Sequence, residues 1–384
     1  MLKPLRLQPA RVLLTFGVAA LVIALGSMNP SRAHAADSTT VTTIATTHGN
    51  VSKVVLSHDG SKLYAMGYNG TTDIIDTASR QITGTMSTPN SIYMALAPGS
   101  SSRAYFTNWN AGELVPVDTL TDTPLTPISL PHTDVWGLAV TPNGSKVVVN
   151  SHNGSAIEIV NVATSAVTSV PVGANDRVMD LAITPNGRYA FVTDTQSSTL
   201  HVLDLSTNTL VPGGVTLPSS GRRIVMNDQG TIAYVSTIEN YIYVINVATK
   251  SVLRTITLPN ASGVIALALS NDGKRLYTVE GSSGVAYVIS TSDDRVLKTV
   301  ALPTGTSSED VALSSDSKRL YVARQFNQPG ITIVDFGSVP GEESLANTGL
   351  NQSILWIGLS AVLLGTAINV VRRKKKQPQA ACRE

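Results

Sequence analysis

A repeat of about 43 residues is the feature that most constrains how this chain can fold. A turn dipeptide followed by a short strand recurs along it, as in Asp59-Gly60 before Tyr64 and Asn186-Gly187 before Phe191. Asn-Gly and Asp-Gly favour the primed turns of two-residue hairpins, so each marker predicts a hairpin. Seven strand residues align, at spacings of 41, 43, 43, 43, 43 and 44: Tyr64, Tyr105, Val148, Phe191, Tyr234, Tyr277 and Tyr321.

Each unit holds four β-rich segments: a run before the turn, the strand after it, a segment ending in a polar residue such as Asp76 or Asp204, and a further strand. A period of 40 to 45 residues with four short strands is typical of propeller blades around a central channel. The sequence therefore predicts an all-β, seven-bladed β-propeller over residues 36–336.

The last unit lacks a fourth strand, because the chain runs into the short linker 337–344 after its third. The segment Thr40 to Thr46 precedes the first complete unit and has the pattern of an outer strand. A propeller avoids open sheet edges. We therefore expect this N-terminal strand to pair with the Ile331 to Val334 strand and close the last blade.

The repeats resemble the YVTN-repeat β-propeller family. Its motif, Pro-Asp-Gly-x-x-x-Tyr-Val-Thr-Asn followed by Val-x-Val-Ile-Asp, is matched by Pro185-Asn186-Gly187 with Phe191-Val192-Thr193-Asp194, and by Tyr241-Ile242-Tyr243-Val244-Ile245-Asn246. The resemblance covers residues 40–336 and implies the fold. It leaves function open, because members of such fold families bind, scaffold or catalyse.

Residues 1–35 have the pattern of a secretory signal peptide. A basic start is followed by the apolar run 12–25 and by Ala33-His34-Ala35, which offers signal peptidase the small residues that it requires. We expect cleavage after Ala35. The alternative, an uncleaved membrane anchor, is less favoured because the run is shorter than the roughly 20 residues that span a bilayer.

The C-terminal end has three parts in a fixed order: the pentapeptide Leu345-Ala346-Asn347-Thr348-Gly349, a predicted transmembrane helix over 350–371, and a basic tail over 372–384. Five consecutive basic residues at the start of the tail predict a cytoplasmic C-terminus. This end resembles the sorting signals of Gram-positive surface proteins, in the Leu-Ala-x-Thr-Gly form used in high-GC species. An ordinary single-pass protein is the alternative.

The sorting resemblance implies that sortase joins Thr348 to peptidoglycan. The chain is then expected at the cell wall, with signal peptidase, sortase and peptidoglycan as partners and the membrane as a temporary one. Residues 1–35 carry four basic and no acidic side chains, and residues 349–384 carry six basic and one acidic. Removing both from the net charge of +2 leaves about −7, which argues against nucleic acid as a partner.

Motifs for chemistry are weak. The only cysteine, Cys382, lies in the basic tail, so the exported domain has no disulfide or thiolate site. No two histidines stand at metal-ligand spacing, and no P-loop or Gly-x-Ser-x-Gly motif occurs. We therefore expect no cofactor, no metal and no catalytic residue.

Aromatic residues gather at one position of the repeat, four residues after the aligned strand residue. On three consecutive units this position holds Tyr68, Trp109 and His152, followed by Asn69, Asn110 and Asn153. Flat rings beside amides suit a sugar or a protein hot spot. The alternative is that these rings only cover loops between blades.

The innermost strands carry a second candidate site, at the mouth of the channel. Its residues, at one repeated position, are Lys53, Tyr93, Asp180, Arg223 and Asp310. They are interpreted either as a polar mouth for a small ligand or as ion pairs, Asp180 with Arg223 and Asp310 with Lys53, that join blades. The sequence thus predicts a wall-anchored module for binding, adhesion or scaffolding, with a surface-tethered hydrolase or lyase of lactonase type as the alternative.

Overall fold

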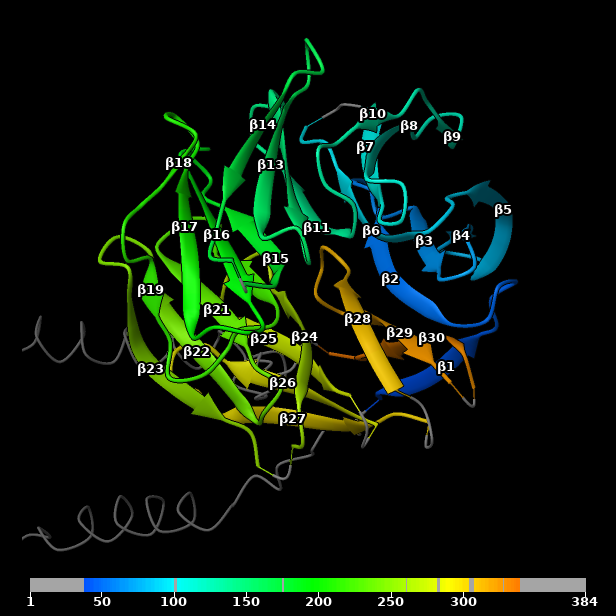
Figure 1. Ribbon diagram of the computed structural model, residues 1–384. Helices are drawn as coiled ribbons and strands as arrows, with labels where there is room; N and C mark the ends of the chain where they lie inside the picture. Colours follow the sequence, from blue (N-terminus) through cyan, green and yellow to red (C-terminus); the bar gives the residue numbers. More distant parts are fainter. Residues whose placement is uncertain are drawn as a thin grey trace, which may run out of the picture. The chain divides into compact units, whose positions relative to one another are not determined.

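The computed structural model describes residues 38–338, apart from positions 100, 101, 175, 260, 282, 283, 304–306 and 327. Every regular element among them is a β-strand, and the strands form seven antiparallel sheets arranged as a propeller (Figure 1). No helix among these residues is long and apolar enough to cross a membrane. The signal peptide, the sorting pentapeptide and the transmembrane helix expected over 350–371 lie outside the described residues.

The strands are numbered in chain order, and each blade runs from an innermost to an outermost strand. Blades 1 to 3 comprise β2 (Val51–Leu56), β3 (Lys62–Gly67), β4 (Thr71–Asp76), β5 (Gln81–Ser87); β6 (Ser91–Leu96), β7 (Arg103–Asn108), β8 (Glu113–Asp118), β9 (Thr123–Pro124), β10 (Ile128–Ser129); β11 (Val135–Val140), β12 (Lys146–Ser151), β13 (Ala156–Asn161), β14 (Val167–Pro171). Blades 4 to 7 comprise β15 (Val178–Ile183), β16 (Tyr189–Asp194), β17 (Thr199–Asp204), β18 (Thr209–Leu210), β19 (Val215–Thr216); β20 (Ile224–Met226), β21 (Ile232–Ser236), β22 (Tyr241–Asn246), β23 (Ser251–Thr257); β24 (Val264–Leu269), β25 (Arg275–Glu280), β26 (Val285–Ser290), β27 (Val296–Ala301); β28 (Ser307–Leu313), β29 (Arg319–Gln325), β30 (Gly330–Asp335), β1 (Thr40–Ile44).

The N-terminal strand closes the propeller, which confirms the prediction made from the missing fourth strand. β1 pairs antiparallel with β30, from Thr40 opposite Asp335 to Ile44 opposite Ile331 (Figure 1, blue beside orange). Arg80 of blade 1 adds a second connection, since its Nη2 lies 2.6 Å from Asp335 Oδ2 and its Nη1 donates to Thr42 Oγ1 at 2.9 Å. The two ends of the ring are therefore held by backbone pairing and by an ion pair.

The hydrophobic core lies between blades rather than around the axis. Seven clusters of buried side chains occur, each shared by two neighbouring blades. The aligned strand residues of the repeat all belong to them, with Tyr64, Phe191 and Tyr277 fully buried. Burying one such side chain contributes roughly 1.5 to 3 kcal/mol to the stability of the fold. The aligned residues of the repeat are therefore the ones that stabilise the interfaces between blades.

The repeated hairpins are present, but their turns are not of the primed type that the dipeptides suggested. A type I′ turn needs positive φ at both central residues, whereas only the glycine has it, with φ 70° at Gly60 and 70° at Gly187. The preceding Asp59 instead accepts the backbone N–H of Ser61 at 3.0 Å. This side-chain turn satisfies the loop without a positive φ at Asp59.

The topology separates two faces of the propeller. The turns between the first and second strands lie on one face, here the lower face. The loops between the second and third strands, and those from the fourth strand to the next blade, lie on the opposite, upper face. Seven small residues of the innermost strands are partly exposed and pack against the clusters between blades: Val55, Ala95, Ala139, Ala182, Val225, Ala268 and Ala312.

Candidate functional site

The three rings predicted for one sector of the upper face have different environments. Tyr68 and Trp109 lie in the loops after β3 and β7 and are 49% and 39% exposed. The Tyr68 hydroxyl accepts a hydrogen bond from Gln325 Nε2 at 2.8 Å, which links blade 1 to blade 7. Among the described residues, no hydrogen bond or ring stacking involves the Trp109 side chain. Trp109 is therefore free to contact a ligand.

His152 is used inside the fold. Its imidazole stacks on Trp136 with ring centroids 4.3 Å apart and planes 17° from parallel. Its Nδ1 lies 3.3 Å from the carbonyl oxygen of Val178 in the next blade. Burial lowers the pKa of His152, so the neutral ring is favoured. This residue fits the interpretation of a ring that covers a loop between blades.

The three asparagines also differ. Asn69 Oδ1 accepts the Thr71 N–H at 3.1 Å, and Asn153 Nδ2 donates to Asp134 Oδ2, so both side chains stabilise their own loops. Asn110 is exposed beside Trp109. Blade 2 therefore presents an exposed ring and an exposed amide next to each other.

A further aromatic side chain on the upper face is Phe326, which the sequence comparison missed. It follows β29 in blade 7 and is 59% exposed. Its φ of 54° is unusual for a residue other than glycine, and its N–H donates to Asn50 Oδ1 of blade 1 at 2.8 Å. Phe326 stands five rather than four residues after the aligned position, in the unit whose spacing is 44. Phe326, Tyr68 and Trp109, from consecutive blades 7, 1 and 2, are called the aromatic rim below.

At the channel mouth, Lys53 and Asp310 form the ion pair that closes blade 7 against blade 1. Lys53 Nζ lies 3.1 Å from Asp310 Oδ2, and the same oxygen accepts the Val54 N–H at 3.2 Å. Their side chains are 21% and 8% exposed. The pair therefore serves the closure of the ring at the same time as it lines the channel.

The second expected pair, Asp180 with Arg223, is not formed in the part of the chain that the structure describes. Asp180 Oδ2 accepts the Ile224 N–H at 3.1 Å, so it binds the backbone next to Arg223 instead. Asp180 lines the channel and is enclosed by the surrounding blades. This burial, opposed mainly by Lys53, raises the pKa of Asp180 to about 6.

Arg223 and Tyr93 meet inside the mouth. The guanidinium carbon of Arg223 lies 5.0 Å from the centroid of the Tyr93 ring, and Lys53 Nζ lies 5.3 Å from the same centroid. Both cations are close enough for cation–π attraction. Three buried polar atoms here have no partner among the described residues: the Tyr93 hydroxyl and the Nε and Nη1 atoms of Arg223. Unsatisfied buried donors are costly, so this position favours a hydrogen-bond acceptor.

Arg222 and Glu309 lie one residue nearer the upper face and connect the mouth to the aromatic rim. Arg222 Nη2 is 3.5 Å from Glu309 Oε2, and the two side chains are 20% and 19% exposed. Burial, and next the charge of Glu309, raise the pKa of Tyr68, while the hydrogen bond from Gln325 and the charges of Arg223 and Arg222 oppose them. Tyr68 is therefore close enough to the charges of the mouth to be influenced by them.

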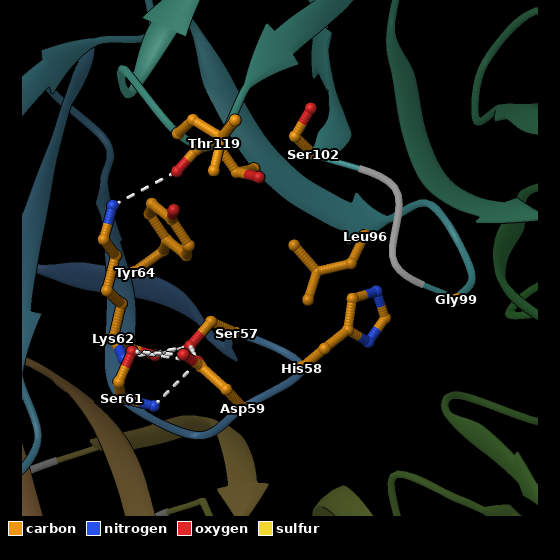
Figure 2. Close-up of a pocket in the computed structure, with 11 residues that line it drawn as sticks. Ser57, His58, Asp59, Ser61, Lys62, Tyr64, Leu96, Gly99, Ser102 and Thr119 are labelled. Atoms are coloured by element: carbon orange, nitrogen blue, oxygen red, sulfur yellow. Dashed lines mark hydrogen bonds between the residues drawn. The ribbon is translucent and has the colours of Figure 1, made fainter.

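The lower face holds recesses between blades that are unlike a binding site. One of 440 Å³ lies between blades 1 and 2, where Lys62 donates to the Thr119 carbonyl oxygen at 3.1 Å and Asp59 is bound by Ser57 and Ser61 (Figure 2). A recess of 610 Å³ recurs between blades 3 and 4, where Lys146 donates to Asn208 Oδ1 at 2.9 Å. Because the same contacts repeat, we interpret them as joints between blades.

No protein-family model matches the sequence, and no curated protein matches it. Among solved structures the chain is similar to hydrazine synthase of Kuenenia stuttgartiensis, with 16% identity and a TM-score of 0.66 over 77% of this chain and 98% of that chain. It is also similar to the Cps50 (Swd1) β-propeller domain of Myceliophteria thermophila, with 11% identity and a TM-score of 0.67 over 77% and 99%. At these identities the similarity establishes the propeller fold alone.

Proposed function

We propose that the chain is a binding module of the bacterial cell surface, which takes an extracellular glycan or protein on the upper face of its propeller. The observation that carries this proposal is the aromatic rim. Of the eight exposed large hydrophobic side chains in the described part of the chain, four stand in upper-face loops, and three of these four belong to consecutive blades. Exposed rings from adjacent loops supply contact area at low entropic cost and are the usual anchors of interfaces.

The channel mouth supplies the polar part of this surface. The unpaired donors of Arg223 and Tyr93, together with Lys53 beneath the rim, favour a ligand that carries a carboxylate or another acceptor group. Rim and mouth meet at Tyr68. A ligand that lies over the rim is therefore expected to direct an acceptor group toward the channel.

The test uses single substitutions of the rim residues and an immobilised panel of cell-surface glycans and extracellular host proteins. Trp109→Ala and Phe326→Ala are each expected to weaken binding about 10-fold or more, because each removes a hydrophobic anchor. Leu120→Ala is the matched control, since Leu120 is 79% exposed on the lower face. Binding that is equal in all three variants would overturn the proposal.

A second function, hydrolysis or elimination at the channel mouth, is favoured by Asp180. A carboxyl with a pKa of about 6 is mostly ionised at pH 7 and is a stronger base than an ordinary carboxylate, which suits general acid–base catalysis. Lys53 and Arg223 could stabilise a developing oxyanion nearby. Multiple turnovers of a lactone or glycan substrate that are lost in Asp180→Asn would establish this activity in place of simple binding.

A further inference from the structure

Three potential metal ligands converge on the upper face of blade 4. Asp176 lies in the loop before β15, Asp194 ends β16, and His201 is the third residue of β17. His201 Nε2 is 3.1 Å from Asp176 Oδ2 and 3.3 Å from Asp194 Oδ2. All three ligand atoms lie within 4.8 Å of one another. These ligands come from three separate segments, so no regular spacing along the chain indicates them.

The other blades provide an internal comparison. The third residue of the third strand commonly holds the loop before its own blade: Asp73 faces His48 at 3.6 Å, Glu158 faces His132 at 2.5 Å, and the Tyr243 hydroxyl lies 2.8 Å from Ser219 Oγ. In blade 3, one imidazole thus faces one carboxylate. In blade 1, Asp73 accepts the N–H and the hydroxyl of Thr47 at 2.8 and 2.5 Å, and His48 Nε2 lies closer to the Ala65 carbonyl oxygen, at 3.0 Å. Either arrangement is sufficient to hold the loop.

Blade 4 differs in two ways. The imidazole is on the strand and a carboxylate is in the loop. A second carboxylate, Asp194, stands where blades 1 and 3 have Gly67 and Ser151, and where blade 6 has Glu280, which binds Ser262 of the loop before its blade. One N–H on His201 Nε2 cannot fully satisfy two carboxylate oxygens at once. Backbone hydrogen bonds to Asp194 and Asp176 hold these loops, but they do not account for two carboxylates that meet the same ring nitrogen of His201.

The spacing of the three atoms suits a divalent metal ion. Ligands bound at 2.0 to 2.2 Å in tetrahedral or octahedral geometry are about 3.0 to 3.5 Å apart, which includes both distances measured from His201. The side chains of His201 and Asp176 are 11% and 17% exposed, so an ion could enter and keep a water ligand. With a neutral imidazole, two carboxylates leave a charge of −2 that a divalent ion would balance.

Hydrogen bonds from the backbone already orient both carboxylates. Asp194 Oδ1 accepts the N–H groups of Gln196 at 2.7 Å and Arg177 at 3.1 Å, and Asp176 Oδ2 accepts that of Gly173 at 2.8 Å. Preoriented ligands of this kind are typical of metal sites.

We propose that Asp176, Asp194 and His201 bind one divalent transition-metal ion, for which zinc is the best fit. Two carboxylate oxygens and an imidazole nitrogen favour such a metal over Mg²⁺ or Ca²⁺, which prefer oxygen ligands alone. The ion would fasten the loop before β15 to the second and third strands of blade 4. This site is separate from the aromatic rim and does not depend on the proposed binding function.

The test is a titration of the chelator-treated, full-length protein with Zn²⁺ by calorimetry, with thermal melting in parallel. We expect one zinc ion per chain and a rise in Tm on saturation, since an ion that binds only the folded state stabilises it. Asp176→Asn is expected to weaken zinc binding at least 10-fold and to abolish the rise in Tm. The matched control, His132→Asn, alters a histidine with a single carboxylate partner and is expected to keep one zinc ion at unchanged affinity.

His201→Gln serves as a second ligand variant, and metal-free melting curves of all variants identify any that do not fold. Co²⁺ provides an independent signal, because its visible absorption spectrum reports the geometry of its ligands. The proposal is overturned if the wild-type chain shows no saturable zinc binding, or if a folded Asp176→Asn or His201→Gln variant binds zinc as the wild type does.

Discussion

Two aspartates at one position of the repeat have different partners because the neighbouring blades differ. Asp310 and Asp180 each accept a backbone N–H from the next blade, at 3.2 Å and 3.1 Å. Lys53 also neutralises Asp310, whereas Arg223, at the position of Lys53, lies against Tyr93 instead. Among the described residues Asp180 therefore has no ion-pair partner, and its burial, opposed mainly by the more distant Lys53, raises its pKa to about 6.

The raised pKa of Asp180 predicts a pH-dependent stability difference. The folded state holds this proton more tightly than the unfolded state, so the contribution of Asp180 to stability falls as pH rises from about 3.8 through about 6 and is constant above. Asp180→Asn removes this loss. The free energy of unfolding of the variant minus that of the wild type is therefore expected to be larger at pH 7.5 than at pH 3.5, by on the order of 1 to 3 kcal/mol, as measured by urea unfolding.

Asp310→Asn is the natural comparison for this experiment. It removes the partner of Lys53 rather than an isolated carboxylate, so it is expected to lower stability near neutral pH. An Asp180→Asn variant whose stability follows that of the wild type at every pH would contradict the environment inferred for Asp180.

For single residues, the sequence predicted where a side chain lies better than it predicted which groups that side chain binds. Comparison of the repeats indicated the exposed rings of Tyr68 and Trp109, and the pairing of Lys53 with Asp310 followed from the neighbouring blades. It could not predict that the Asp180 carboxylate would bind a backbone N–H, since this depends on side-chain direction. The sequence comparison missed Phe326 because its unit has one additional residue, which places Phe326 five rather than four residues after the aligned strand residue.

The strands that occur in every repeat could be predicted from the sequence. The strands that differ between blades do so because of proline and glycine residues within them. The outer strands of blades 2 and 4 are each split in two, β9 with β10 and β18 with β19. Pro127 separates the first pair, and Gly213 and Gly214, both at positive φ, separate the second. Proline and glycine interrupt the hydrogen-bond ladder of a sheet in this way. The splits in these two outer strands can therefore be explained from the sequence once the limits of the strands are known.

The closure strand carries the main prediction at this scale. Deletion of residues 38–47 removes β1 and leaves one side of β30 unpaired, so Tm is expected to fall by about 5 °C or more in a thermal melt. A peptide of the same ten residues, added in trans, is expected to restore part of the loss. Val41→Thr, an exposed position of β1, is the control and is expected to leave Tm nearly unchanged. An unaltered melting curve for the deletion would sink the closure model.

For the molecule as a whole, the topology orients the upper face. β30 ends at Asp335, opposite Arg319, which follows the last lower-face turn. The last strand of blade 7 therefore ends on the lower face, away from the aromatic rim.

The location at the cell wall is tested through Thr348, which lies outside the described residues. If sortase attacks this residue, Thr348→Ala is expected to abolish covalent attachment, so that detergent extracts the protein without digestion of peptidoglycan. The wild-type chain is expected to require a muralytic enzyme for its release. Equal detergent extraction of both forms from Gram-positive cells would contradict wall anchoring.

Pairing of β30 on both sides has a mechanical consequence. A pull on the C-terminal end of the propeller enters through this strand, which is bonded to β29 along one edge and to β1 along the other. The load then acts along two ladders in shear, so several hydrogen bonds must break together before the strand can slide. A propeller held by its C-terminal end would therefore resist unfolding under force at β30, the strand that β1 pairs with to close the ring.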